Sequence, residues 1–256
     1  MRYTPRYNVV LAIGCGSTAG LGLLAGPWID AGATYALKAA AFFAVLMAAI
    51  VWIAGAQHPY PRFGPANYVT AIRAMLAALV AGLIGHPATP EVLWSVIGLT
   101  ALMAALDGLD GWLARRTRMA SAFGARFDME TDALLILILS VLVWQHGKAG
   151  VWVLLCGLMR YGFVAAGWLL PWLAGPLRPT RRGRTVAVGQ LFGLSVALAP
   201  IVPAPLSAGA AAITLAALVW SFAIDVLWLS RHRGSLESTN LRSSICTSIS
   251  NRHIDQ

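Results

Sequence analysis

Four aspartates at regular spacing are the residues of this sequence best suited to chemistry. Asp107 and Asp110 stand three positions apart, and Asp128 and Asp132 stand four positions apart, in a chain with ten acidic residues. Two carboxylates 4 Å apart repel by about 4 kcal/mol at an effective dielectric constant near 20, so they would take up protons unless cations lay between them. Mg²⁺ takes oxygen ligands and keeps positions for phosphate oxygens. The spacing therefore predicts a metal site for a diphosphate substrate.

Each pair of aspartates would lie on one face of a helix. Residues three or four positions apart share a helix face. The separation along the axis would be about 4.5 Å for Asp107 and Asp110, and about 6 Å for Asp128 and Asp132. A turn over residues 116–123 would make the two helices antiparallel, so the four carboxylates can converge.

A simpler interpretation is that the aspartates form solvated ion pairs with neighbouring arginines, which are Arg115, Arg116, Arg118 and Arg126. For any single aspartate, that interpretation is favoured. The complete arrangement, with two carboxylate pairs and small residues between them, favours a binding site instead.

The composition predicts an integral membrane protein. Hydrophobic residues make up 58% of the chain and charged residues 11%, whereas about a quarter of the residues of a soluble domain are charged. A helix needs roughly 20 apolar residues to cross a bilayer. The predicted fold class is all-α, with about eight transmembrane helices, which cover residues 8–29, 34–56, 68–86, 90–110, 127–146, 149–173, 185–203 and 207–230.

The basic residues predict the orientation, because short cytoplasmic loops are enriched in Lys and Arg. With a cytoplasmic N-terminus, sixteen of the nineteen basic residues fall on the cytoplasmic side, namely Arg2, Arg6, Arg62, Arg73, Arg115, Arg116, Arg118, Arg126, Arg178, Arg181, Arg182, Arg184, Arg231, Arg233, Arg242 and Arg252. Lys38 and Lys148 fall on the opposite side, and Arg160 falls inside a span. Both termini and the aspartates are therefore expected at the cytoplasmic face of the inner or cell membrane. Topology and anionic lipid account for the net charge of +9, and no nucleic-acid partner is expected.

Breaks in composition divide the chain into three parts. Three prolines between residues 58 and 66 interrupt helix formation. They predict an N-terminal two-helix membrane hairpin at residues 1–57 and a six-helix core at residues 58–233. Residues 234–256 are polar without an apolar period and are predicted to be a disordered cytoplasmic tail. The first apolar run exceeds the 7 to 15 residues of a signal-peptide core, so it is interpreted as a membrane helix.

The run from Asp107 to Asp132 resembles the signature of the CDP-alcohol phosphotransferase family, D-x-x-D-G-x-x-A-R, eight residues, and G-x-x-x-D-x-x-x-D. Every fixed position is filled, by Asp107, Asp110, Gly111, Ala114, Arg115, Gly124, Asp128 and Asp132. The signature covers about 26 residues, and a six-helix core is consistent with the family's fold.

The resemblance implies a reaction at the cytoplasmic membrane surface, in which an acceptor alcohol attacks the phosphorus of a CDP-alcohol and CMP is released. It implies that the four aspartates bind two divalent cations, Mg²⁺ or Mn²⁺, and that Asp132 is also the general base for the acceptor hydroxyl. It further implies a CDP pocket lined by Gly111, Ala114, Arg115 and Gly124.

Residues 66–73 resemble a second family motif, P-N-x-x-T-x-x-R, with Ala66 in place of the proline. The resemblance implies that Asn67 and Thr70 face the nucleotide or its phosphates. Asn67 is equally suited to the N-cap of a helix, where Asn is favoured, and the two roles are compatible.

Arg160 is costly inside a membrane, so it should face a polar cavity or a charged partner. It resembles the arginine that the family carries near the acceptor site. The alternative is a buried salt bridge between Arg160 and Asp225. Without such a salt bridge, Asp225 is expected to be solvated at the membrane interface.

A basic run at residues 178–185 loosely resembles a family segment that could hold a phosphorylated acceptor. Positive-inside topology explains the run equally well. The residues predicted to bind the acceptor are Arg118, Arg160, Arg181 and Arg184.

The predicted function is phosphatidyl transfer from CDP-diacylglycerol in phospholipid biosynthesis. One alternative places the CDP on an amino-alcohol headgroup. A membrane aromatic prenyltransferase would need a second, distant aspartate cluster, and a cation transporter would need carboxylates near mid-membrane and often internal repeats. The acceptor stays open among glycerol phosphate, inositol phosphate, serine, choline and another phospholipid. For the N-terminal hairpin we consider regulation, packing of a homodimer, and narrowing of the lipid entrance.

Overall fold

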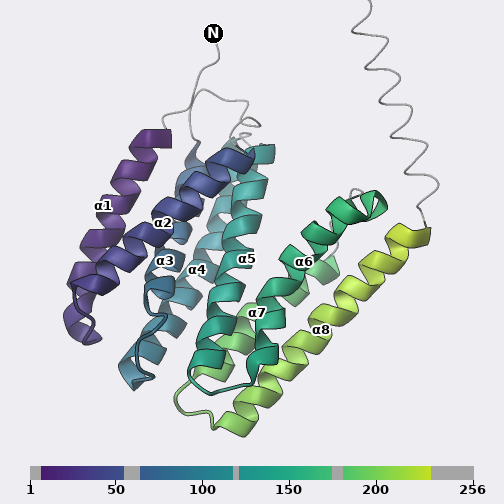
Figure 1. Ribbon diagram of the computed structural model, residues 1–256. Helices are drawn as coiled ribbons and strands as arrows, with labels where there is room; N and C mark the ends of the chain where they lie inside the picture. Colours follow the sequence, from purple (N-terminus) through teal and green to yellow (C-terminus); the bar gives the residue numbers. More distant parts are fainter. Residues whose placement is uncertain (1–6, 55–63, 118–120, 175–180, 232–256) are drawn as a thin grey trace, which may run out of the picture.

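The computed structural model describes residues 7–54, 64–117, 121–174 and 181–231, and over these residues the chain is helical without strands (Figure 1). Successive helices run in alternating directions. The eight α-helices are α1 (Tyr7–Ala25), α2 (Ala33–Ala54), α3 (Pro65–Gly82), α4 (Pro90–Thr117), α5 (Ala122–Gln145), α6 (Leu155–Leu169), α7 (Arg181–Leu198) and α8 (Ala204–Arg231). Three short 3₁₀ helices, η1 (Gly26–Trp28), η3 (Val151–Leu154) and η4 (Pro171–Ala174), extend or connect them.

The predicted all-α class is confirmed, and each predicted hydrophobic stretch corresponds to one α-helix. Within the described residues, five helical segments are long and apolar enough to cross a membrane, and they are Asn8–Trp28, Ala33–Trp52, Pro90–Leu109, Val151–Leu169 and Ala204–Arg231. The count of eight membrane spans stays a prediction.

Helix boundaries follow local sequence signals. Proline occupies the first position of α3 and of α4, where its missing N–H is not needed and its φ is already helical. Ser121 caps α5 by accepting a hydrogen bond from the backbone N–H of Gly124 at 3.0 Å. The turn between α3 and α4 contains Gly85, and the turn between α5 and α6 contains Gly147. Both glycines have positive φ, a conformation that glycine adopts without steric cost.

Helix α5 lies between two groups of helices (Figure 1). It packs against α2 and α3 on one side and against α6 and α7 on the other. At α6 the contact is very close, because a methyl group at Gly157 would lie 2.4 Å from the Cα atom of Leu137. The N-terminal helices share this core, since Phe43 and Met47 of α2 are buried with Phe123 and Phe127 of α5. The division of the chain after residue 57 stays a prediction.

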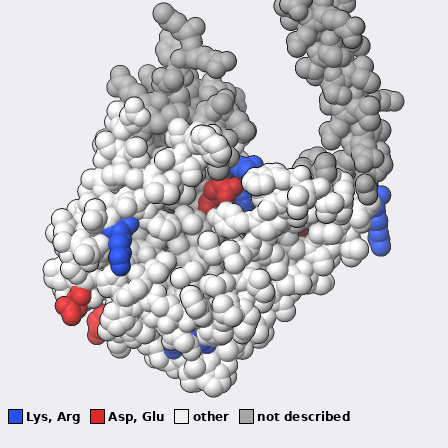
Figure 2. All heavy atoms as spheres, viewed as in Figure 1, with Lys and Arg blue, Asp and Glu red and all other residues white. Residues whose placement is uncertain are grey.

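Helix α4 is longer than the hydrocarbon core of a bilayer is thick. Its 28 residues extend about 42 Å at 1.5 Å per residue, whereas the hydrocarbon core of a bilayer is about 30 Å thick. The apolar part of α4 ends at Leu109, so Asp107 lies at the boundary and the last two turns extend past it. Figure 2 shows acidic and basic atoms gathered in a recess between the two groups of helices.

The opposite end of the bundle carries its own polar contacts. The Nζ atom of Lys148 donates hydrogen bonds to the carbonyls of Ala199 at 3.0 Å and Val202 at 2.6 Å, just after α7 ends. These bonds join the turn after α5 to the loop between α7 and α8.

Candidate active site

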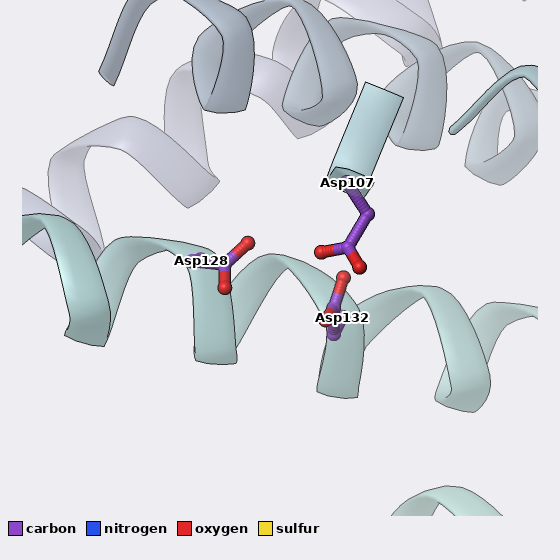
Figure 3. Close-up of side chains that lie close together, drawn as sticks. All are labelled: Asp107, Asp128 and Asp132. Atoms are coloured by element: carbon purple, nitrogen blue, oxygen red, sulfur yellow. The ribbon is translucent and has the colours of Figure 1, made fainter. Parts of the chain in front are cut away.

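Three of the four predicted aspartates come together between α4 and α5. Asp107 is on α4, and Asp128 and Asp132 are one turn apart on α5 (Figure 3). One carboxylate oxygen from each lies within 4.8 Å of the other two. The side chain of Asp110 lies outside the described residues, although its backbone continues α4 one turn beyond Asp107.

The antiparallel pair formed by α4 and α5 explains this convergence. Asp107 lies ten residues before the end of α4, and Asp132 lies ten residues after the start of α5. At 1.5 Å per residue both are about 15 Å from the turn, so they face each other at the same level. The sequence spacing predicted this convergence for the aspartates whose side chains are described.

A buried arginine from a third helix joins the three carboxylates. The Nη1 atom of Arg73, on α3, lies 3.1 Å from Asp107 Oδ1 and 2.5 Å from Asp128 Oδ1. Its Nη2 atom donates a hydrogen bond to Asp132 Oδ1. The side chain of Arg73 is only 2% exposed, whereas those of Asp107, Asp128 and Asp132 are 46%, 38% and 33% exposed. Arg73 therefore forms the floor of the site, and the carboxylates open outward.

No role at this site is predicted for Arg73 from the sequence, although this residue fills the final position of the family motif over residues 66–73. Its surroundings are a second signal, because this charged residue lies eight residues after the start of α3 in a run of alanines and leucines. It also follows Asn67 and Thr70 at three-residue intervals, which places the three side chains on neighbouring faces of the helix.

The charge and chemistry of the cluster fit a divalent cation. Three carboxylates carry −3 and the guanidinium carries +1, so the four groups in contact leave a net charge of −2. Carboxylate oxygens are the ligands that Mg²⁺ and Mn²⁺ prefer. The partial exposure of the aspartates leaves them accessible to an ion and a substrate.

Asn67 and Gly124 bring α3 and α5 into close approach beside the aspartates. Asn67 is 7% exposed and Thr70 is 3% exposed. A methyl group at Gly124 would lie 2.7 Å from Asn67 Oδ1 and 3.3 Å from Ser121 Oγ. The predicted N-cap role of Asn67 is wrong, because Gly64 precedes Pro65 at that position with φ of 77°, and Asn67 lies inside the first turn.

A second charged group lies on the other side of α5. Arg160 of α6 donates a hydrogen bond from Nη2 to Glu130 Oε1 at 2.8 Å, and Arg126 Nε lies 3.3 Å from the same oxygen. No role is predicted for Glu130 from the sequence. Its position in the sequence is the available signal. Glu130 falls midway between Asp128 and Asp132, and residues two apart on a helix do not face the same way, so its carboxylate must point away from the other two.

The predicted alternative partner of Arg160 is wrong. Asp225 of α8 pairs with Arg182 of α7 instead, and the Arg182 guanidinium also lies 6.0 Å from the ring centre of Trp220. Each of these two arginines therefore pairs with a carboxylate on a neighbouring helix.

The remaining predicted site residues fall into two groups. Gly111 lies on α4 one turn beyond Asp107, and Arg184 is exposed in the first turn of α7. The described residues do not include Arg118 or the side chains of Ala114, Arg115 and Arg181.

The sequence matches the family described as CDP-alcohol phosphatidyltransferase over residues 63–224, from just before α3 into α8. It is 32% identical over 144 residues to the CDP-diacylglycerol–glycerol-3-phosphate 3-phosphatidyltransferase of Pseudomonas fluorescens, covering 52% of this chain and 71% of that protein. A protein of the same name from Cereibacter sphaeroides is 30% identical over 89 residues, 35% of this chain and 40% of the relative.

Ethanolaminephosphotransferase 1 of Homo sapiens is also similar, with 32% identity over 104 residues. This alignment covers 34% of this chain but only 26% of the human protein. No protein of known structure matches the chain at a significant level.

The aspartate cluster predicts measurable metal binding. We expect Mn²⁺ to bind the purified protein, and Asp107→Asn or Asp128→Asn to weaken binding by at least about tenfold, because each variant removes a charged oxygen ligand. Electron paramagnetic resonance of free Mn²⁺ during a titration measures the affinity. Asp30→Asn is the matched control, since Asp30 is exposed at the other end of α1 and its φ of 48° is one that Asn tolerates. Equal affinities in all three variants would contradict the assignment.

Proposed function

Because the chain belongs to the CDP-alcohol phosphatidyltransferase family, we propose that it transfers the phosphatidyl group of CDP-diacylglycerol to an acceptor alcohol with release of CMP. The observation that carries the proposal is the convergence of Asp107, Asp128 and Asp132 inside the part of the chain that matches the family. Two relatives whose names include CDP-diacylglycerol support this donor.

The aspartates are proposed to hold the metal ions of the reaction. Asp107, Asp128 and Asp132, together with Asp110, would bind two divalent cations, Mg²⁺ or Mn²⁺, which neutralise charge on the diphosphate as the bond to CMP breaks. The match with the family, whose members depend on divalent metal, supports the assignment. Helices α4 and α5 each pack against α3, which would hold the aspartates of the two helices in fixed positions for these ions.

The proposed reaction is a single displacement at phosphorus. The acceptor hydroxyl oxygen forms a bond to the phosphorus that carries diacylglycerol, and the bond from that phosphorus to the bridging oxygen breaks. CMP leaves with the bridging oxygen, and the hydroxyl proton passes to a carboxylate. We assign that carboxylate to Asp132, which is 33% exposed and therefore within reach of an acceptor from solution.

Asn67, Thr70 and Gly124 are proposed to shape the nucleotide side of the site, together with Gly111, Ala114 and Arg115. The close approach at Gly124 supports this assignment, because only glycine leaves Asn67 in its observed position. The buried Asn67 amide is a fixed polar group beside the carboxylates.

The boundary position of Asp107 suits a donor with both a lipid and a nucleotide part. The acyl chains of CDP-diacylglycerol need the bilayer, and its diphosphate needs the polar layer, so phosphorus must lie near the level where the apolar part of α4 ends at Leu109. The arginines at this end of the bundle support a cytoplasmic location for both termini and for the site.

The arginines on the α6 and α7 side of α5 support an acceptor that carries a phosphate. Arg160 and Arg126 share Glu130, which leaves an excess of positive charge at that point. Glycerol 3-phosphate, which is part of the names of two relatives, has the complementary charge. An ammonium group, as in ethanolamine, does not.

The deciding experiment measures CMP release by the purified protein. With CDP-diacylglycerol, Mg²⁺ and glycerol 3-phosphate we expect CMP and a lipid product in equal amounts, and EDTA should abolish both. Asp107→Asn should lower the rate by more than about 100-fold through loss of metal-assisted catalysis, while Asp30→Asn keeps it. Turnover only with CDP-ethanolamine and diacylglycerol would replace the proposed donor, and no CMP from either donor would overturn the proposed function.

Gly124 tests the nucleotide side of the site. We expect Gly124→Ala to raise the KM for CDP-diacylglycerol about tenfold, equivalent to about 1.4 kcal/mol, because the new methyl group displaces Asn67. Gly108→Ala is the control, since a methyl group there would meet nothing within 4 Å. Steady-state kinetics on both variants measure the difference, and an unchanged KM in Gly124→Ala would remove the proposed role of this contact.

Arg160 tests the acceptor side. We expect Arg160→Ala to raise the KM for glycerol 3-phosphate roughly 10- to 100-fold, the effect of losing a charge-assisted hydrogen bond of about 1.5–3 kcal/mol. In the same variant, the KM for CDP-diacylglycerol should change by less than about twofold. Arg231→Ala, at the exposed end of α8, should leave both values unchanged. Equal increases for donor and acceptor would reject an acceptor-specific role.

A further inference from the structure

Arg73 occupies the space between the carboxylates that are proposed to bind metal. Its Nη1 atom contacts both Asp107 and Asp128, and its Nη2 atom contacts Asp132. These are the same three residues whose oxygens lie within 4.8 Å of one another. One guanidinium therefore contacts every described ligand of the proposed metal site.

The burial of Arg73 makes these contacts energetically necessary for the folded protein. A buried charge is costly unless it is paired and hydrogen bonded, and Arg73 is 2% exposed. The three carboxylates in turn require a positive charge between them, because they repel one another strongly without a cation. Three helices, α3, α4 and α5, are thus joined through one set of charges.

Three other arginines whose side chains the structure describes pair with carboxylates outside the cluster. Arg126 and Arg160 contact Glu130, and Arg182 contacts Asp225. Among the residues that the structure describes, Arg73 is the cation in contact with the aspartate cluster. Its planar guanidinium has five donors, which lets it bridge carboxylates on two helices as a compact lysine ammonium would not.

We propose that Arg73 is a built-in counter-cation that holds the aspartates together when metal is absent and competes with metal for their oxygens. The inference rests on the proposed metal-dependent function. Mg²⁺ binds carboxylate oxygens at about 2.0–2.1 Å in a near-octahedral shell. Arg73 contacts one oxygen of each of these aspartates and neutralises part of their charge, so a cation that binds the same carboxylates competes with the guanidinium for their lone pairs and their negative charge.

The competition sets the order in which the site fills. The positive charge of Arg73 lowers the affinity of the substrate-free enzyme for metal. Diphosphate oxygens of the donor add ligands that offset this loss, so metal and CDP-alcohol bind more tightly together than separately. Arg73 is in this sense a positioning residue that ties metal loading to the presence of substrate.

Arg73→Met tests the proposal, because it removes the charge and the donors but keeps a long side chain. Without metal, in EDTA, we expect a lower midpoint of thermal unfolding than in the wild type. In the Mn²⁺ titration the variant should bind at least about tenfold more tightly, the scale by which neighbouring groups alter metal affinity. Arg182→Met is the matched control, since it also breaks a pair between helices and should leave Mn²⁺ affinity unchanged.

A second measurement separates competition from general loosening of the fold. Addition of CDP-diacylglycerol should tighten Mn²⁺ binding by a larger factor in the wild type than in Arg73→Met. If Arg73→Met does not fold, Arg73→Lys provides the test, with tighter Mn²⁺ binding than the wild type because lysine has fewer donors. Unchanged or weaker Mn²⁺ binding in the folded variant would overturn the proposal.

Failure of this inference is distinguishable from failure of the proposed function. CMP release by the wild type with unchanged Mn²⁺ affinity in the variant would reject the role of Arg73 alone. Tighter Mn²⁺ binding in the variant without CMP release by the wild type would reject the function and leave the competition in place.

Discussion

Mutual repulsion of carboxylates is the constraint on which the rest of this structure depends. The carboxylates of Asp107, Asp128 and Asp132 lie close enough to repel one another strongly unless positive charge lies among them. The fold supplies it from inside, through the buried guanidinium of Arg73. Because that guanidinium comes from α3, the packing of α3 against α4 and α5 and the charge of the site cannot be separated. The helices that form the site are also the ones that its charges hold together.

The membrane adds a second constraint, which acts on depth. A carboxylate cluster in the hydrocarbon would be very costly, and one far from the bilayer would be out of reach of a lipid phosphate. Helix α4 satisfies both requirements by being longer than the hydrocarbon is thick, so that Asp107 lies where its apolar part ends. The long helix places the chemistry at a defined depth, whereas a mobile loop would leave that depth undefined.

The sequence predicted the helices and the aspartate cluster better than the partners of the charged residues. Apolar length predicts each helix, and three- and four-residue spacing predicts which aspartates share a face. Ion pairing between distant helices has no such local signal, which is why Asp225 is the alternative partner that the sequence suggests for Arg160, although Arg160 contacts Glu130. The same limit applies to Arg73, whose contacts lie 34 to 59 residues away and depend on how three helices pack. The N-cap prediction for Asn67 failed for a local reason, because Pro65 starts the helix earlier.

Helix α5 divides the site into two electrostatic halves. Asp128 and Asp132 point toward α4 and the proposed donor side, while Glu130 between them contacts Arg160 on α6. A single turn of helix therefore carries carboxylates for metal on one face and an anchor for arginines on the other. Since a helix is rigid over so short a length, the distance between the two halves is set by its diameter of about 10–12 Å. The charges that would hold the metal and the charges that would hold an acceptor phosphate are thus kept on different faces of one helix, so a cation on the aspartate side does not compete with the arginines for Glu130.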